Sequence, residues 1–170
     1  QNMVNLDKVL GISSQLADIE RIRRILGQEK LIIIGHSYGG FLATLYAIEF
    51  PEHVKKMILI APAAVLRMPV EEGGFEQLKD FLSEAMKKEF EDFLARYFDY
   101  GNIFQKNEQG LAKLNFELVK FYEAAYSAEG ANLPDGAEIR EEDIGGWMVH
   151  AMYFSLGLKY DIKQELKKVE

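Results

Sequence analysis

The residues best suited to do chemistry lie together in the stretch Gly35-His36-Ser37-Tyr38-Gly39, which fits the pattern Gly-x-Ser-x-Gly. This pattern is typical of a nucleophile elbow, a sharp turn between a strand and a helix that exposes a serine hydroxyl. Glycines on either side, including Gly40 after the motif, leave room for close backbone approach. A serine placed in this way can attack a carbonyl carbon, and the backbone N–H of Tyr38 can stabilise the oxyanion that develops.

The elements that must position this serine are visible on both sides of it. Residues 30–35 are a continuous apolar, β-branched run, which predicts a strand buried on both faces of a parallel sheet. Residues 41–50 predict a helix that ends near Pro51, and residues 55–63 predict a second buried strand. Together they form a βαβ unit. A phosphate-binding loop is the alternative, but that loop would require more glycines or a nearby lysine.

Helical patterns dominate the remainder of the chain. The first predicted helix spans residues 13–27, with Ser13 or Ser14 as its N-cap and Gly27 as the left-handed residue after its end. Amphipathic spacing predicts later helices over residues 75–98, 109–128 and 142–156, with a possible last helical turn within residues 160–170. The chain is therefore expected to be mostly helical by residue count.

The composition excludes several classes of function. A formal charge of −7 without a basic patch argues against nucleic-acid binding. The chain has no cysteine, which excludes disulfides and thiolate metal sites and is compatible with a cytoplasmic location. Its apolar runs are too short to span a bilayer, so no membrane partner is expected. We also expect no metal and no cofactor.

Residues 29–63, EKLIIIGHSYGGFLATLYAIEFPEHVKKMILIAPA, resemble the elbow region of the α/β-hydrolase family, and in particular its proline iminopeptidase-like branch, whose members have a helical cap. The resemblance extends over about residues 13–65, and the cap follows the family only in outline. It implies that Ser37 is the nucleophile of an acyl-enzyme mechanism and that Tyr38 gives one oxyanion N–H. It favours an aminopeptidase acting on small peptides, with an esterase or amidase as the alternative.

The resemblance also implies a domain organisation. The expected fold is α/β: a partial α/β-hydrolase core, built as strand, elbow, helix and strand, with an inserted helical cap. Residues 1–65 would form the core with the elbow, residues 66–158 the cap, and residues 159–170 a segment that returns toward further core strands.

The family requires an acid and then a histidine base after the serine in chain order, and neither can be identified in this chain. His36 is adjacent to Ser37, and neighbouring side chains on such a turn point apart. His53 follows the helix that leaves the elbow, about 20 Å away. His150 lies in a cap helix, where packing or pocket lining is the simpler interpretation.

The cap is rich in residues that could contact a substrate. Trp147, His150 and Tyr122 are the candidates for lining a pocket above Ser37. In iminopeptidase-like relatives, cap carboxylates bind the amino terminus of the substrate. The carboxylates available for that role here are Glu117, Glu123, Glu129, Glu138, Glu141, Glu142 and Asp143.

Two parallel strands cannot form a stable sheet alone, so these strands are expected to belong to a larger one. Three explanations follow: the chain is a fragment, as its start at Gln1 also suggests; a companion chain supplies the remainder with the missing Asp and His; or two copies exchange elements. Self-association through the exposed sheet edge is a further candidate interaction. In each case we expect the chain alone to be inactive. A non-catalytic helical binding module is the alternative of a different class.

Overall fold

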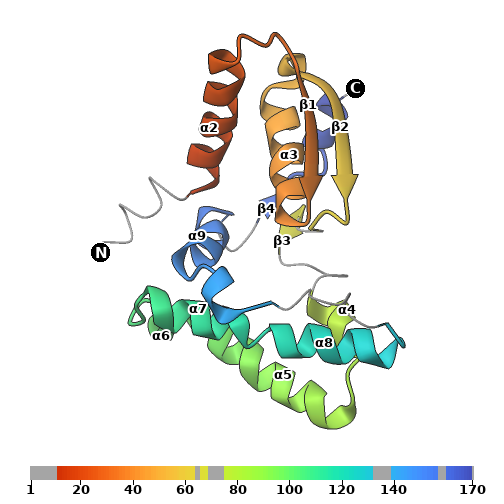
Figure 1. The fold of residues 1–170 in the computed structure, drawn as a ribbon, viewed down its shortest axis with the longest axis vertical. Coiled ribbons are helices and arrows are strands. Elements are labelled where there is room, and N and C mark those ends of the chain that lie inside the picture. The colour runs from red at the N-terminus through yellow and green to blue at the C-terminus, as the bar shows by residue number, and fades with distance from the viewer. Residues whose placement is uncertain (1–10, 64–65, 69–74, 132–138, 157–159, 170) are drawn as a thin grey trace. The chain divides into compact units, whose positions relative to one another are not determined.

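The computed structural model describes residues 11–63, 66–68, 75–131, 139–156 and 160–169 (Figure 1). The chain forms two units. The first, here called the core unit, comprises Gln1–Gly74 with Ala151–Glu170, and the second, the helical unit, comprises Phe75–His150. Helices account for most of the described residues, which confirms the expected mostly helical α/β fold.

The centre of the core unit is the predicted βαβ arrangement. Strand β1 (Leu31–His36) leads through Ser37 into helix α3 (Tyr38–Glu49), and the 3-10 turn η1 (Pro51–His53) leads into strand β2 (Val54–Ile60). The two strands pair in parallel, with Gly35 opposite Leu59 and His36 opposite Ile60. Helix α3 covers one face of this sheet (Figure 1).

The other face of the sheet is open within the described part of the chain. Ile32 and Ile34 of β1 are 58% and 65% exposed, and Ile58 and Ile60 beside them on β2 are also exposed. Leu31 and Ile33, on the opposite side of the same strand, are partly buried. The expectation that these strands are buried on both faces is therefore not met by the described residues, because α3 supplies only one layer of packing.

Helix α2 (Ile12–Ile25) packs against α3, close to the predicted range of 13–27. Its N-cap is Gly11, whose position gives no side-chain hydrogen bond, so the prediction of a serine cap was wrong. Gly27 has φ +62°, as predicted for the residue that ends this helix.

A second, short sheet joins distant parts of the core unit. Strand β3 (Arg67–Met68) pairs antiparallel with strand β4 (Tyr160–Asp161). The backbone N–H of Ile162 donates to the carbonyl of Leu66 at 2.9 Å, which extends this ladder. The turn predicted near the C-terminus is the 3-10 helix η3 (Glu165–Lys168), which packs against α3.

The helical unit contains more, shorter helices than the periodicity predicted. They are α4 (Phe75–Asp80), α5 (Glu84–Tyr97), α6 (Tyr100–Ile103), α7 (Glu108–Phe116), α8 (Val119–Ala128), the 3-10 turn η2 (Glu141–Asp143) and the start of α9 (Trp147–Leu156). The predicted helix over 75–98 is interrupted because Ser83 caps α5, accepting from the N–H of Met86. The predicted helix over 142–156 begins only at Trp147.

Aromatic side chains form the interior of the helical unit. Phe90, Phe93 and Phe121 are fully buried, and the ring centroids of Phe90 and Phe121 lie 4.8 Å apart. Rings at such distances and tilts contribute beyond the area that they bury. Phe90 and Phe93, on the predicted amphipathic segment of residues 75–98, thus pack against Phe121 of α8 within this unit. No helix among the described residues is long and apolar enough to cross a bilayer.

Candidate active site

Ser37 has the backbone conformation of a strained strand-to-helix turn. Its φ and ψ are 50° and −121°, and among the described non-glycine residues only Ala61 also has a positive φ. L-residues rarely adopt this region, and such strain concentrates at functional sites. Ser37 is exposed and immediately precedes α3, so its hydroxyl lies at the positive end of a twelve-residue helix.

Glycines make this turn possible, but not all of the motif's glycines do so equally. A Cβ on Gly35 would lie 2.4 Å from the carbonyl oxygen of Gly39, and a Cβ on Gly40 would lie 2.7 Å from the Cβ of Pro62. Around Gly39 no such atom comes within 4 Å. The steric requirement for glycine therefore falls on Gly35 and Gly40, whereas Gly39 is required by the sequence pattern alone.

Tyr38 lies next to the serine at the start of α3. As the first residue of the helix, it has no residue one turn earlier in α3 to accept its N–H, which makes this N–H a candidate oxyanion donor. Its hydroxyl donates to Oε1 of Gln15 on α2 at 3.0 Å, and burial raises the pKa of this phenol. The side chain of Tyr38 thus ties the elbow to α2, and no sequence pattern indicated the part played by Gln15.

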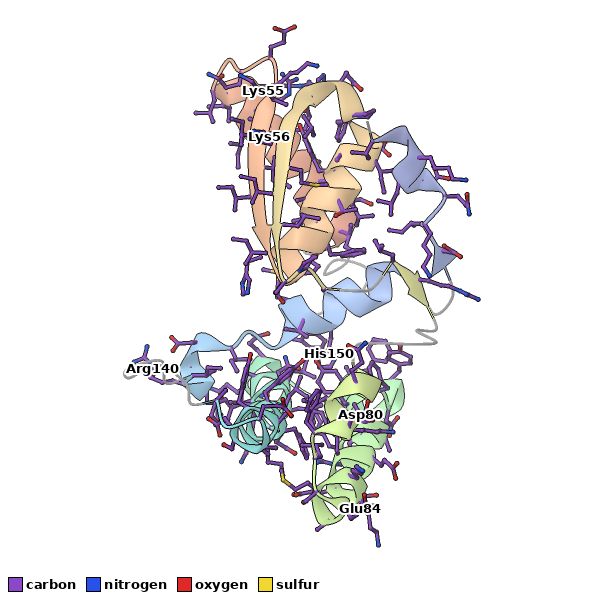
Figure 2. All side chains as sticks on the ribbon, turned by 90° about the vertical axis from the view of Figure 1, so that its right-hand side faces the viewer. Lys55, Lys56, Asp80, Glu84, Arg140 and His150 are labelled. Atoms are coloured by element: carbon purple, nitrogen blue, oxygen red, sulfur yellow. The ribbon has the colours of Figure 1, made fainter. Side chains whose placement is uncertain are left out.

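Neither of the histidines described in the core unit, His36 and His53, hydrogen-bonds to the Ser37 hydroxyl. His36 is the last residue of β1 and is exposed. His53 lies after α3, and twelve helical residues separate it from the elbow by about 18 Å. Figure 2 shows Lys55 and Lys56 at the end of the sheet where β2 begins. His53 immediately precedes β2, whereas Ser37 follows the end of β1. The triad base is not supplied by these residues.

His53 instead belongs to a buried polar cluster around Glu20. The Glu20 carboxylate is 6% exposed and accepts from the Arg23 and Arg24 guanidinium groups at 2.7 and 2.8 Å and from the Tyr46 hydroxyl at 2.8 Å. Nδ1 of His53 lies 3.2 Å from the same carboxylate.

The cluster perturbs the titration of its members. The hydrogen bond from Arg23 is the main cause that holds the pKa of Glu20 well below its usual range. Burial, with the bond to Glu20, raises the pKa of Tyr46 to about 12. Because these residues come from α2, α3 and η1, the cluster links these three elements of the core unit.

The candidate pocket residue His150 is on α9 in the helical unit (Figure 2). It is 2% exposed, its ring centroid is 5.1 Å from that of Tyr97, and its Nε2 has no hydrogen-bond partner. Burial lowers the pKa of His150 to about 4, so the ring is neutral near pH 7. This geometry is that of a packed histidine.

The other two candidates lie at different places in the unit. The N–H of Trp147 and that of Gly146 donate to the Glu108 carboxylate at 2.8 and 2.6 Å, which fixes the start of α9 against α7. Tyr122 on α8 is 44% exposed, and its pKa is raised by burial and by Tyr126. The role of Trp147, His150 and Tyr122 at a substrate pocket stays a prediction.

Some of the cap carboxylates line a cavity of about 1050 Å³ between α7 and the η2 segment. Its acidic lining residues are Glu108, Glu141, Glu142 and Asp143, and Arg140 binds the last two of these. Glu117 is occupied by Arg96, and Glu138 lies outside the described residues. No cluster of three or more potential metal ligands occurs in the described part of the chain.

The fold and the elbow together define a chain built around a serine at a strand-to-helix turn. Residues 8–104 match the family described as alpha/beta hydrolase fold, and the chain belongs to this family. No solved structure matches the chain.

Curated relatives match over a short part of the chain. The chain is 51% identical over 47 residues to a mouse protein named (Lyso)-N-acylphosphatidylethanolamine lipase, which is 28% of this chain and 14% of the relative. It is 46% identical over 44 residues to human 1-acylglycerol-3-phosphate O-acyltransferase ABHD5, which is 26% of this chain and 13% of the relative. The matches thus span about one seventh of each relative's length. Neither relative is named as a peptidase.

Proposed function

We propose that this chain provides the nucleophile and the cap of an enzyme that cleaves or transfers acyl groups through Ser37. The observation that carries the proposal is the strained φ of 50° at an exposed serine preceding α3. A glycine-rich loop without catalytic function would have no need of strain at a serine. Membership of the α/β-hydrolase fold family supports hydrolase chemistry in general.

In the proposed reaction, the Ser37 hydroxyl attacks the carbonyl carbon of the substrate while its proton passes to a histidine base. The N–H of Tyr38 stabilises the resulting oxyanion, and collapse of this intermediate expels the leaving group and forms an acyl-enzyme. Water, or an acceptor alcohol in a transferase, then releases the acyl group with the same base assisting.

We propose that the histidine and its acid come from segments outside this chain or from a companion chain. Two observations support this. Neither His36 nor His53 of the core unit bonds to Ser37, and the sheet face opposite α3 exposes Ile32, Ile34, Ile58 and Ile60. Additional strands would extend the sheet at its edge, and additional helices would cover that face. Self-association through the edge is the second way to extend the sheet.

An acyl ester or amide of a lipid is the substrate class that the relatives support, since they are named as a lipase and an acyltransferase. The aminopeptidase expected from the resemblance receives no support from them. The peptide substrate, the cytoplasmic location and the role of the cap carboxylates stay predictions.

Labelling with a fluorophosphonate probe tests the proposal. The chain is incubated with the probe alone and with any companion polypeptide identified by native mass spectrometry, and the modified residue is located by peptide mapping. We expect labelling at Ser37, loss of labelling in Ser37→Ala, and turnover of p-nitrophenyl acyl esters only with the companion.

Comparing a prolyl amide with acyl esters as substrates separates the aminopeptidase from the lipid-ester proposal. Faster turnover of a prolyl amide than of every acyl ester would replace the lipid-ester proposal by the aminopeptidase. No labelling of Ser37 in the complete assembly would favour the non-catalytic binding module and overturn the proposal.

A further inference from the structure

The three residues that follow β2 lie against the elbow, although the motif does not include them. The chain leaves β2 at Ala61, which has φ 39° and is, with Ser37, one of two described non-glycine residues with positive φ. The two strained residues follow paired strand positions, because His36 lies opposite Ile60. Strain at both places shows that the surrounding contacts determine the local backbone.

Both backbone polar groups of Ser37 bond to this part of the chain. Its N–H donates to the carbonyl of Ile60 at 3.1 Å, and its carbonyl accepts from the N–H of Ala63 at 2.9 Å. The same carbonyl accepts from Gly40 and Phe41 in the first turn of α3. The peptide after Ser37, which carries the N–H of Tyr38, is therefore fixed from two sides.

Pro62 packs against the start of α3, next to the elbow. A Cβ on Gly40 would lie 2.7 Å from the Cβ and 3.0 Å from the Cα of Pro62, so the proline lies directly against the first turn of the helix. The proline ring restricts its own backbone and cannot turn aside as a long side chain can. The backbone of residues 61–63 therefore has little freedom to move away from the elbow.

We propose that Pro62 and Ala63 are positioning residues for the nucleophile, and that they maintain Ser37 in its positive-φ conformation. This inference rests on the proposed function of Ser37. If the contacts were lost, the serine could relax to negative φ, which would displace both its hydroxyl and the N–H of Tyr38. A displacement of about 1 Å in a reacting group can reduce a rate by about 100-fold.

Gly40→Ala tests the proposal, because the new methyl group must displace Pro62. In the complete assembly, we expect labelling of Ser37 by the fluorophosphonate probe to be about 10–100-fold slower in the folded variant than in the wild type. Pro62→Gly tests the same contact from its other side: it removes the ring that lies against Gly40, and we expect it also to slow labelling of Ser37. Gly145→Ala is the matched control, since its methyl group meets only the Cβ of Met148 at 3.7 Å, and it should label at the wild-type rate.

Two measurements do not depend on reactivity. The one-bond Cα–Hα coupling of Ser37 in NMR spectra reports the sign of φ, and we expect Gly40→Ala to shift it toward negative φ. Hydrogen exchange at the Ala63 amide should become about tenfold faster in this variant. Circular dichroism of each variant establishes that the compared proteins are folded.

The outcomes separate the two proposals. An unchanged Ser37 coupling and unchanged Ala63 exchange in Gly40→Ala would overturn the positioning role, whether or not Ser37 reacts. A wild-type labelling rate in that variant, with the coupling shifted, would also overturn it. A wild-type Ser37 that does not react in the complete assembly, with the coupling shifted as expected in the variant, would refute the proposed function while the positioning of the serine backbone stands.

Discussion

Replacement of Gly35 by alanine should destabilise the core unit, whereas the same replacement at Gly39 should stabilise it. A Cβ added at Gly35 would lie 2.4 Å from the carbonyl oxygen of Gly39 and 2.7 Å from the Cα of Gly40. Both are backbone atoms, which cannot rotate away. Since Cβ contacts below 3.0 Å are essentially never observed, the strand and the helix must separate by at least the missing 0.6 Å.

The expected magnitudes follow from these contacts. Forced overpacking costs about 1–3 kcal/mol in free energy of unfolding. Gly39 is the second residue of α3 and a Cβ there meets no atom within 4 Å, so Gly39→Ala should gain about 0.5–1 kcal/mol from helix propensity. Urea unfolding followed by far-ultraviolet circular dichroism measures both variants against the wild type. Equal destabilisation by the two substitutions, or none by Gly35→Ala, would refute the reasoning from Cβ contacts.

Three further predictions concern side chains that bond or pack in the interiors of the two units. The folded-state pKa of Glu20 lies below its ordinary value of 4.5, so its ionised form adds stability above about pH 4.5 that is lost as the pH falls further. Glu20→Gln should therefore unfold at a lower urea concentration than the wild type near neutral pH, and the difference in urea midpoint should shrink by about pH 3. A difference that stays constant with pH would contradict this. His150 has its pKa lowered from 6.5 to about 4, so its contribution should make the wild type less stable as the pH falls from 6.5 toward 4. His150→Leu should lose less stability over this range, as monitored by fluorescence of the single tryptophan, and equal pH dependence in both proteins would count against the assignment. Gln15→Leu should lower the free energy of unfolding by about 0.5–1.5 kcal/mol, because it removes the acceptor of the Tyr38 hydroxyl. The double variant with Tyr38→Phe should lose less than the sum of the two single variants, whereas strict additivity would exclude coupling between the two side chains.

The elbow could be predicted from sequence because its determinants are local. The strand, the turn and the helix around Ser37 fall within residues 31–49, and each has its own periodicity or glycine signal. The helix interruptions were harder, since residues 75–98 keep an amphipathic pattern through the break that Ser83 caps. Capping there depends on one hydroxyl and not on the repeat of apolar residues.

Contacts between distant residues could not be predicted in the same way. Glu20 and His53 meet across 33 positions, and nothing in either residue type indicates the other. Ala63 contributes to the site through its backbone N–H, which every residue except proline also has. The pairing of β3 with β4 involves two residues on each strand, which is too short for any alternation to be visible.

That short pairing has a consequence for how such a chain can change over time. Arg67 and Met68 lie beside Asp161 and Tyr160, so the chain that departs after β3 returns to an adjacent point at β4. The entropy of closing a loop between fixed ends rises only slowly with its length. The segment between residues 68 and 160 can therefore be lengthened, shortened or replaced without altering β1 and β2, the strands beside the serine. For the proposed function, this predicts that the insertion can be exchanged while the elbow keeps its geometry.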